Sequence, residues 1–165
     1  MNSTPARATR LVVLAGAAGA TCDIVYAFLY YGWRGVSPER ILQTVASGLL
    51  GKASYDGGWP TAALGLFCHY AIVIVAAALF YAVARRWAWL GEEPITTGLL
   101  YGLAIYVFMN FVVLPLSAYP YPIRFPLLTT ATGLLVHMVG VGLSISLITR
   151  RAHSTTALYG TRSTA

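Results

Sequence analysis

The sequence predicts an all-α fold, an integral membrane four-helix up-and-down bundle with a short interfacial helix on its outer side. Two observations lead to this prediction. Of the 165 residues, 58% are hydrophobic and only 10% are charged, whereas a soluble domain has about 25% charged residues. Four segments also reach the roughly 20 predominantly apolar residues that a membrane-crossing helix needs. These segments are residues 11–31, 61–84, 96–117 and 127–149.

The first apolar segment, residues 11–31, follows Arg7 and Arg10 and has small residues near its middle, which is also the layout of a signal peptide. The apolar region of a signal peptide is about 7–15 residues long. Here apolar sequence continues to Tyr31. We therefore interpret the segment as the first transmembrane helix, and cleavage as a signal peptide is the alternative.

The connection between the first two apolar segments contains a helix of its own, over residues 38–50. Ser37 is suited to cap it, Pro38 occupies the favoured first position, and Glu39 lies near the positive end of the helix dipole. Apolar residues then recur at helical spacing. They are Ile41, Leu42, Val45, Leu49 and Leu50. This pattern indicates an amphipathic helix that covers the outer mouth of the bundle.

The remaining connections differ in length and composition. A short connection joins residues 61–84 to 96–117, so these two helices are expected to be neighbours. Residues 117–126 are rich in proline and aromatic residues and carry Arg124, which predicts a stiff non-helical lid. Residues 1–151 are thus one transmembrane domain, and residues 152–165 are expected to be a disordered cytoplasmic tail.

The basic residues explain orientation better than they explain nucleic-acid binding. The net charge is +6, but the arginines lie at helix ends and form no basic stripe. Seven fall on the side that holds both termini, Arg7, Arg10, Arg85, Arg86, Arg150, Arg151 and Arg162, against Arg34, Arg40, Lys52 and Arg124 on the other. The positive-inside rule therefore predicts cytoplasmic termini. The lipid bilayer is the expected partner, together with further copies of this small chain.

Each apolar segment carries one polar residue that is out of place in lipid: Asp23, His69, Asn110 and His137. At 1.5 Å rise per residue, Asp23 and His69 lie about 12 Å from the outer helix ends, Asn110 about 10 Å and His137 about 15 Å. Small residues, which mark helix contacts in membranes, share their faces. They include Gly16, Gly19, Gly65, Gly102, Gly133 and Gly140. We therefore predict one buried polar site inside the bundle.

The leading functional hypothesis is a membrane protein that handles protons or ions. Buried carboxylates and imidazoles can exchange protons near neutrality, and three tyrosines are placed to support them, Tyr26, Tyr30 and Tyr106. A structural reading of a single His or Asn, as an interhelical hydrogen-bonding residue, remains open. It is weaker for Asp23, because a central Asp costs about 2.5–3.5 kcal/mol on insertion scales.

Two alternatives come from other functional classes. His69 and His137 could be the axial ligands of a haem b in an electron carrier, or the polar layer could only set helix register in an assembly or scaffold subunit. A metal held by Asp23, both histidines and Cys22 or Cys68 lacks the spacing signature of a metal motif, so no metal site is predicted. No serine or cysteine lies in a nucleophile elbow or triad pattern, so no catalytic residue is assigned.

Several short segments resemble the YagU-like family of small bacterial inner-membrane proteins. They are residues 16–23, 65–69, 98–102, 113–117 and 133–137, with Arg150 and Arg151 at the end of the last helix. The resemblance implies a four-helix protein of the bacterial cytoplasmic membrane with a link to acid resistance. It implies no mechanism, and the amphipathic helix at residues 38–50 departs from the family pattern.

Overall fold

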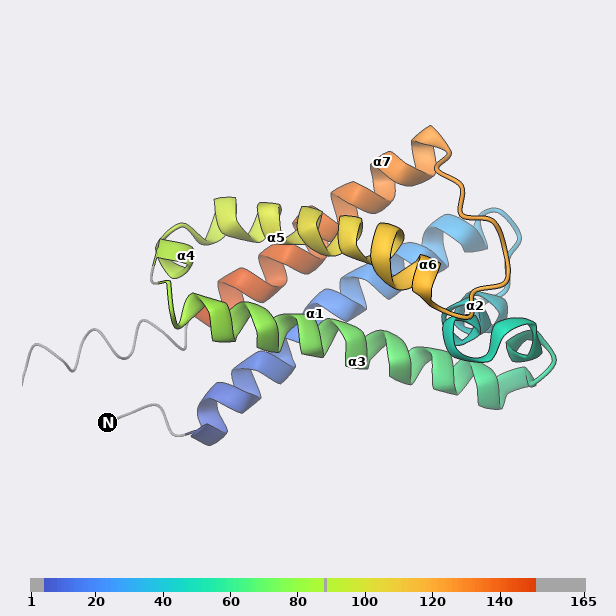
Figure 1. The fold of residues 1–165 in the computed structure, drawn as a ribbon, viewed down its shortest axis with the longest axis horizontal. Coiled ribbons are helices and arrows are strands. Elements are labelled where there is room, and N and C mark those ends of the chain that lie inside the picture. Colours follow the sequence, from blue (N-terminus) through green and yellow to red (C-terminus); the bar gives the residue numbers. More distant parts are fainter. Residues whose placement is uncertain (1–4, 88, 151–165) are drawn as a thin grey trace, which may run out of the picture.

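The computed structural model describes residues 5–87 and 89–150, and within these ranges every regular element is helical (Figure 1). Besides α-helices there are one 3₁₀-helix, η1, and two π-helices, η2 and η3. The elements are α1 (Pro5–Gly32), α2 (Pro38–Leu50), η1 (Gly51–Tyr55), α3 (Gly58–Ala84), α4 (Trp89–Glu92), α5 (Pro94–Phe108), η2 (Met109–Val113), α6 (Leu114–Leu116), α7 (Leu127–Val136) and η3 (His137–Gly142). The tail expected to be disordered, residues 152–165, lies outside the described residues.

Four helices are long and apolar enough to cross a membrane: Pro5–Gly32, Gly58–Ala84, Pro94–Leu116 and Leu127–Arg150. The prediction of four apolar helices in an all-α chain is therefore confirmed. The first helix begins earlier than expected, at Pro5, because the arginines and alanines before residue 11 are good helix formers. Hydrophobicity alone places that boundary too late.

The amphipathic helix α2 has the predicted bounds, Pro38–Leu50, and the predicted cap. Ser37 Oγ accepts a hydrogen bond from the backbone N–H of Arg40 at 3.2 Å. The buried face of α2 packs on α3, where a Cβ at Gly65 would overlap the carbonyl of Leu42. The small residue at Gly65 therefore serves the α2–α3 contact, although the sequence suggested a contact between two long helices.

The contacts between the long helices join α1 to α3 and to η3, and α5 to η3. In Figure 1 the start of α1, the end of α3 and α4 lie at one end, and α2 and η1 lie at the other. The main hydrophobic core joins α1, α3 and the last helix, and it consists of Val12, Ala15, Ala20, Val73, Ala77, Phe80, Ala84, Val141 and Ile145. It fills the interior toward the end where α1 starts, which we call the inner end.

The two π-helices begin where polar side chains compete for the backbone. Asn110 Nδ2 donates to the carbonyl of Tyr106 at 2.9 Å, and His137 Nδ1 is 2.9 Å from the carbonyl of Gly133. Both carbonyls lie four residues earlier, where the α-helical ladder would use them. Side chains that share ladder carbonyls can bend a helix, and these two lie where the helices change form, in η2 from Met109 and in η3 from His137.

The segment after α6, residues 117–126, has no helix, as its prolines predict. It is fastened to α2, because the backbone N–H of Ala118 donates to the carbonyl of Gly48 at 2.8 Å. Phe125 stacks on Phe111 of η2, with ring centroids 5.1 Å apart. These contacts hold the segment over the end of the molecule that lies opposite the inner end, which we call the outer end. The polar residues described below lie next to it.

Candidate functional site

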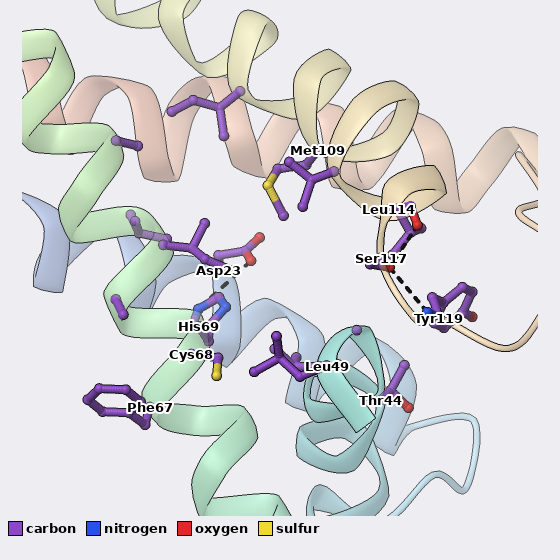
Figure 2. A pocket seen from close by; sticks show the side chains of 18 of the residues that line it. Asp23, Thr44, Leu49, Phe67, Cys68, His69, Met109, Leu114, Ser117 and Tyr119 are labelled. Carbon is purple, nitrogen blue, oxygen red and sulfur yellow. Dashed lines mark hydrogen bonds and ion pairs between the residues drawn. The ribbon is translucent and has the colours of Figure 1, made fainter. Parts of the chain in front are cut away.

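The carboxylate of Asp23 is the centre of the site. It contacts one histidine on each of two other helices: His69 of α3, with Nε2 4.0 Å from Oδ2, and His137 at the start of η3, with Nδ1 3.5 Å from Oδ1. Figure 2 shows Asp23 and His69 facing each other between their helices. The side chains are only 21%, 10% and 18% exposed for Asp23, His69 and His137. Three of the four predicted polar residues thus form one group.

The backbone fixes the tautomer of each imidazole. His69 Nε2 lies 2.9 Å from the carbonyl of Ala20, and His137 Nδ1 lies 2.9 Å from that of Gly133. A carbonyl oxygen only accepts hydrogen bonds, so both nitrogens must carry a hydrogen. No hydrogen bond to another described residue engages His69 Nδ1 or His137 Nε2. Each imidazole therefore keeps one nitrogen that can accept a proton.

Asn110, the fourth predicted residue, is near the group but does not join it. Its amide donates to the carbonyl of Tyr106 on its own helix. It lines the smaller of two pockets, and Asp23 and His137 line the same pocket. Asn110 therefore belongs to the surroundings of the carboxylate and contributes to the shape of η2.

The three tyrosines predicted to support the polar site have different surroundings in the structure. Tyr106 lies edge-on to His137 with ring centroids 5.2 Å apart, and Tyr26 bonds to Thr132 through their hydroxyls at 2.7 Å. Both line the smaller pocket. Tyr30 lines neither pocket, and its hydroxyl bonds to Thr129 at 2.7 Å. Two of the three tyrosines are thus placed to act with Asp23.

A pocket of about 970 Å³ opens between α2, α3 and the segment from α5 to α6, and we call it the lateral groove. Asp23, His69 and His137 form its polar floor, and aliphatic and aromatic side chains form most of its walls. It reaches the surface at Phe67 and Ile72, which are 71% and 39% exposed. In Figure 2, Met109 points across this groove toward Asp23. The polar group is therefore open to the side of the molecule.

A second pocket, of about 310 Å³, lies between the ends of α1, η2 and α7 and the segment 117–126, and we call it the outer pocket. Its lining is more polar and includes Arg124, Asn110 and several hydroxyl groups. Those hydroxyls belong to Tyr26, Tyr31, Tyr106, Tyr119, Thr129 and Thr130. Asp23 and His137 line both pockets. The carboxylate thus lies at the junction of two pockets.

Tyr119 and Leu114 also line both pockets; the sequence placed Tyr119 in the lid segment, residues 117–126, but assigned neither residue to the polar site. Burial raises the pKa of Tyr119, and the neighbouring tyrosines Tyr55 and Tyr121 add to the increase. Its hydroxyl therefore stays protonated over a wide pH range. The proline-rich composition of residues 117–126 was the available signal, because it predicts a rigid segment over the polar layer.

The haem alternative requires one nitrogen of His69 and one of His137 on opposite sides of an iron. The nitrogens nearest Asp23, His69 Nε2 and His137 Nδ1, each lie 2.9 Å from a backbone carbonyl, so the nitrogens left for a ligand role are His69 Nδ1 and His137 Nε2. Within residues 5–87 and 89–150, no group of three or more His, Cys, Asp or Glu side chains is arranged to hold a metal ion.

Cysteine does not complete the group. Both cysteines are free; Cys68 lines the lateral groove, and Cys22 lies against Gly140, where a Cβ would be 3.0 Å from its Cβ. A buried or lipid-facing cysteine usually acts as a small apolar residue. The polar chemistry of the site therefore rests on one carboxylate and two imidazoles.

The chain matches no family model, no curated protein and no solved structure, so the resemblance to the YagU-like family stays a prediction.

Proposed function

We propose that this chain is a multi-pass protein of the bacterial cytoplasmic membrane that handles protons or cations through Asp23, His69 and His137. The observation that carries the proposal is a single carboxylate, held between two imidazoles at the junction of two pockets, in an apolar stretch of α1, residues 11–31, that has no other charged residue. An Asp near the bilayer centre costs about 2.5–3.5 kcal/mol on insertion scales. Ionisable residues that carry this cost inside a membrane are usually functional.

The hydrogen-bond pattern supports proton exchange at the imidazoles. A proton that arrives at His69 Nδ1 or His137 Nε2 leaves both bonds to backbone carbonyls intact. The Asp23 carboxylate lies 4.0 Å from His69 Nε2 and 3.5 Å from His137 Nδ1, so it is close enough to pair with either protonated ring. The group can thus gain or lose a proton with little rearrangement of the helices that hold it.

The arrangement of the four apolar helices is compatible with an up-and-down bundle whose termini are both cytoplasmic. Arg7, Arg10, Arg85, Arg86 and Arg150 belong to the inner end, as the positive-inside rule requires for the cytoplasmic side. The outer pocket then faces the periplasmic side. A chain of this size has little room for a complete pathway, so we infer that it works as a homo-oligomer.

The decisive experiment replaces Asp23 with Asn. This change keeps the size and hydrogen-bonding capacity of the side chain and removes its ionisable proton. We expect proton uptake in proteoliposomes, and survival of acid-challenged cells, to be lost at wild-type membrane abundance. Asp56→Asn is the matched control, because Asp56 is exposed in the turn before α3. Unchanged uptake in Asp23→Asn would leave a polar layer that only sets helix register.

The two histidines provide a second measurement on the same group. Residues that act as one unit give strongly non-additive losses. We therefore expect His69→Gln and His137→Gln each to lose most of the proton uptake that the double variant loses. Independent, additive losses would show that the imidazoles do not share one proton site with Asp23.

A further inference from the structure

The lateral groove has an unusual distribution of charge. Asp23 is the single carboxylate that lines it, and no Lys or Arg among the described residues does so. The other polar groups at its floor are the imidazoles of His69 and His137. The rest of the lining is mostly apolar, and it includes Phe67 and Ile72 of α3 and Met109 of η2. The groove therefore joins one acidic group to a large apolar space.

The size of the groove fits a small organic molecule. Ligand pockets are about 300–1,000 Å³, mostly apolar, with a few polar groups that fix orientation. The groove has a volume of about 970 Å³ and is open at Phe67 and Ile72, so a molecule dissolved in the lipid could enter from the side. The outer pocket, at about 310 Å³, is at the lower limit of this range.

The charge of the groove lining favours a cationic ligand over an anionic one. An anionic head group, such as a phosphate, is normally bound by Arg or Lys, and neither lines the groove. A cation would be attracted by the Asp23 carboxylate, the single charged side chain in the lining. Arg124 lies in the outer pocket, where it disfavours a second cation and leaves that pocket to water and protons.

We propose that the lateral groove binds a lipophilic organic cation, with its charge at Asp23 and its apolar body between α3 and α5, in exchange for a proton. This inference rests on the proposed function, since it names the cation that competes with the proton. The exchange involves no electron transfer. The O–H or N–H bond of the protonated Asp23–histidine group breaks, the proton passes to water in the outer pocket, and the cation pairs with the carboxylate.

The test uses two probes of the same shape and opposite charge, tetraphenylphosphonium and tetraphenylborate. Equilibrium dialysis against purified protein in detergent should show saturable binding of tetraphenylphosphonium alone. Its affinity should fall as the pH is lowered, with protons released on binding, because the cation and the proton compete for Asp23. Asp23→Asn should weaken binding by about tenfold or more, because the charge pair is lost. Equal binding of the two probes, or full binding to Asp23→Asn, would overturn the proposal.

A variant that leaves the polar group in place tests the groove itself. Met109→Trp fills the groove across from Asp23 and should weaken tetraphenylphosphonium binding by about tenfold. Val107→Trp adds the same side chain to an exposed position of α5 that lines neither pocket, and should stay within about twofold of wild type. Unchanged binding in Met109→Trp would place the cation elsewhere and overturn the proposal.

The two proposals can fail separately. If wild-type protein takes up protons and loses that activity in Asp23→Asn, but does not bind tetraphenylphosphonium, the proposed function stands and the cation site is refuted. If tetraphenylphosphonium binds without release of a proton, the exchange is refuted. If Asp23→Asn does not fold, Met109→Trp and Val107→Trp still decide whether the groove is the binding site.

Discussion

The contact between α5 and η3 brings two helix backbones unusually close, and Gly102 is the residue that permits it. A Cβ at Gly102 would overlap the carbonyl oxygen of His137 and would lie 2.5 Å from the Cα of Met138. Gly98 meets the same helix at Gly142. Because backbone atoms cannot rotate out of the way, Gly102→Ala must push the two helices apart.

Two opposing contributions determine how Gly102→Ala changes the free energy of unfolding. Ala in a helix interior is more stable than Gly by about 0.5–1 kcal/mol. Overpacking a close contact costs about 1–3 kcal/mol, and the overlap at Gly102 involves backbone, so the upper part of that range applies. We expect Gly102→Ala to lower the free energy of unfolding by a net of about 1–2 kcal/mol. It should also reduce proton uptake, because the shifted backbone carries His137.

The measurement is unfolding by an increasing fraction of denaturing detergent in mixed micelles, followed by circular dichroism. Gly32→Ala is the control, since a Cβ at Gly32 meets nothing within 4 Å and the residue ends α1. The control should be neutral or slightly stabilising. If Gly102→Ala were as stable as Gly32→Ala, the close packing of α5 on η3 would be wrong, and so would the position of His137.

Three further predictions test other parts of the fold. Ser37→Ala removes the cap of α2 and should cost about 1 kcal/mol in the same assay; an unchanged midpoint would mean that the cap contributes nothing. Tyr101→Phe removes the hydrogen bond to the carbonyl of Ala76, 2.7 Å long, and should cost about 1 kcal/mol; no loss would argue against this α3–α5 contact. Reporters fused after Arg86 and at Ala165 should be cytoplasmic and one near Gly57 exported; a cytoplasmic signal at Gly57 would reverse the topology.

The existence of four apolar helices could be predicted from the sequence, because about 20 predominantly apolar residues mark a helix that can cross a membrane. The start of α1 could not, because that helix continues back through polar residues to Pro5. The level of the polar residues was also predictable, since helical rise is constant. Asp23, His69 and His137 do meet. Their convergence needs only that the helices pack at that level with small residues on the shared face.

The details of the site depend on contacts that local sequence does not specify. In the π-helices η2 and η3, Asn110 and His137 donate to carbonyls of their own helices, and nothing in the surrounding residues distinguishes them from side chains that reach across a bundle. Tyr30 has the same helical face as Tyr26, but it lines neither pocket and its hydroxyl pairs with that of Thr129. The register between neighbouring helices determines which residue each of these side chains contacts.

The lateral groove was not predictable either, since it depends on how two neighbouring helices are held apart. A short connection predicts that α3 and α5 are neighbours, and they do touch where Tyr101 packs on Phe80, with ring centroids 4.9 Å apart. Beyond Tyr101 toward the outer end, α2 and the segment after α6 approach each other, and the groove opens between them and the two helices. Backbone contacts of α5 on η3 fix that spacing.

Access to Asp23 in this structure comes from the groove and from the outer pocket, whereas the inner end is filled by the hydrophobic core. Val141 and Ile145 are fully buried there, one turn or more beyond His137. A carboxylate that only senses external acidity needs no other conformation. A carboxylate that carries a proton or cation across the membrane needs one in which this core separates. The π-helix η3 contains both His137 and Val141, so protonation at the imidazole and opening of the core would act on the same helix.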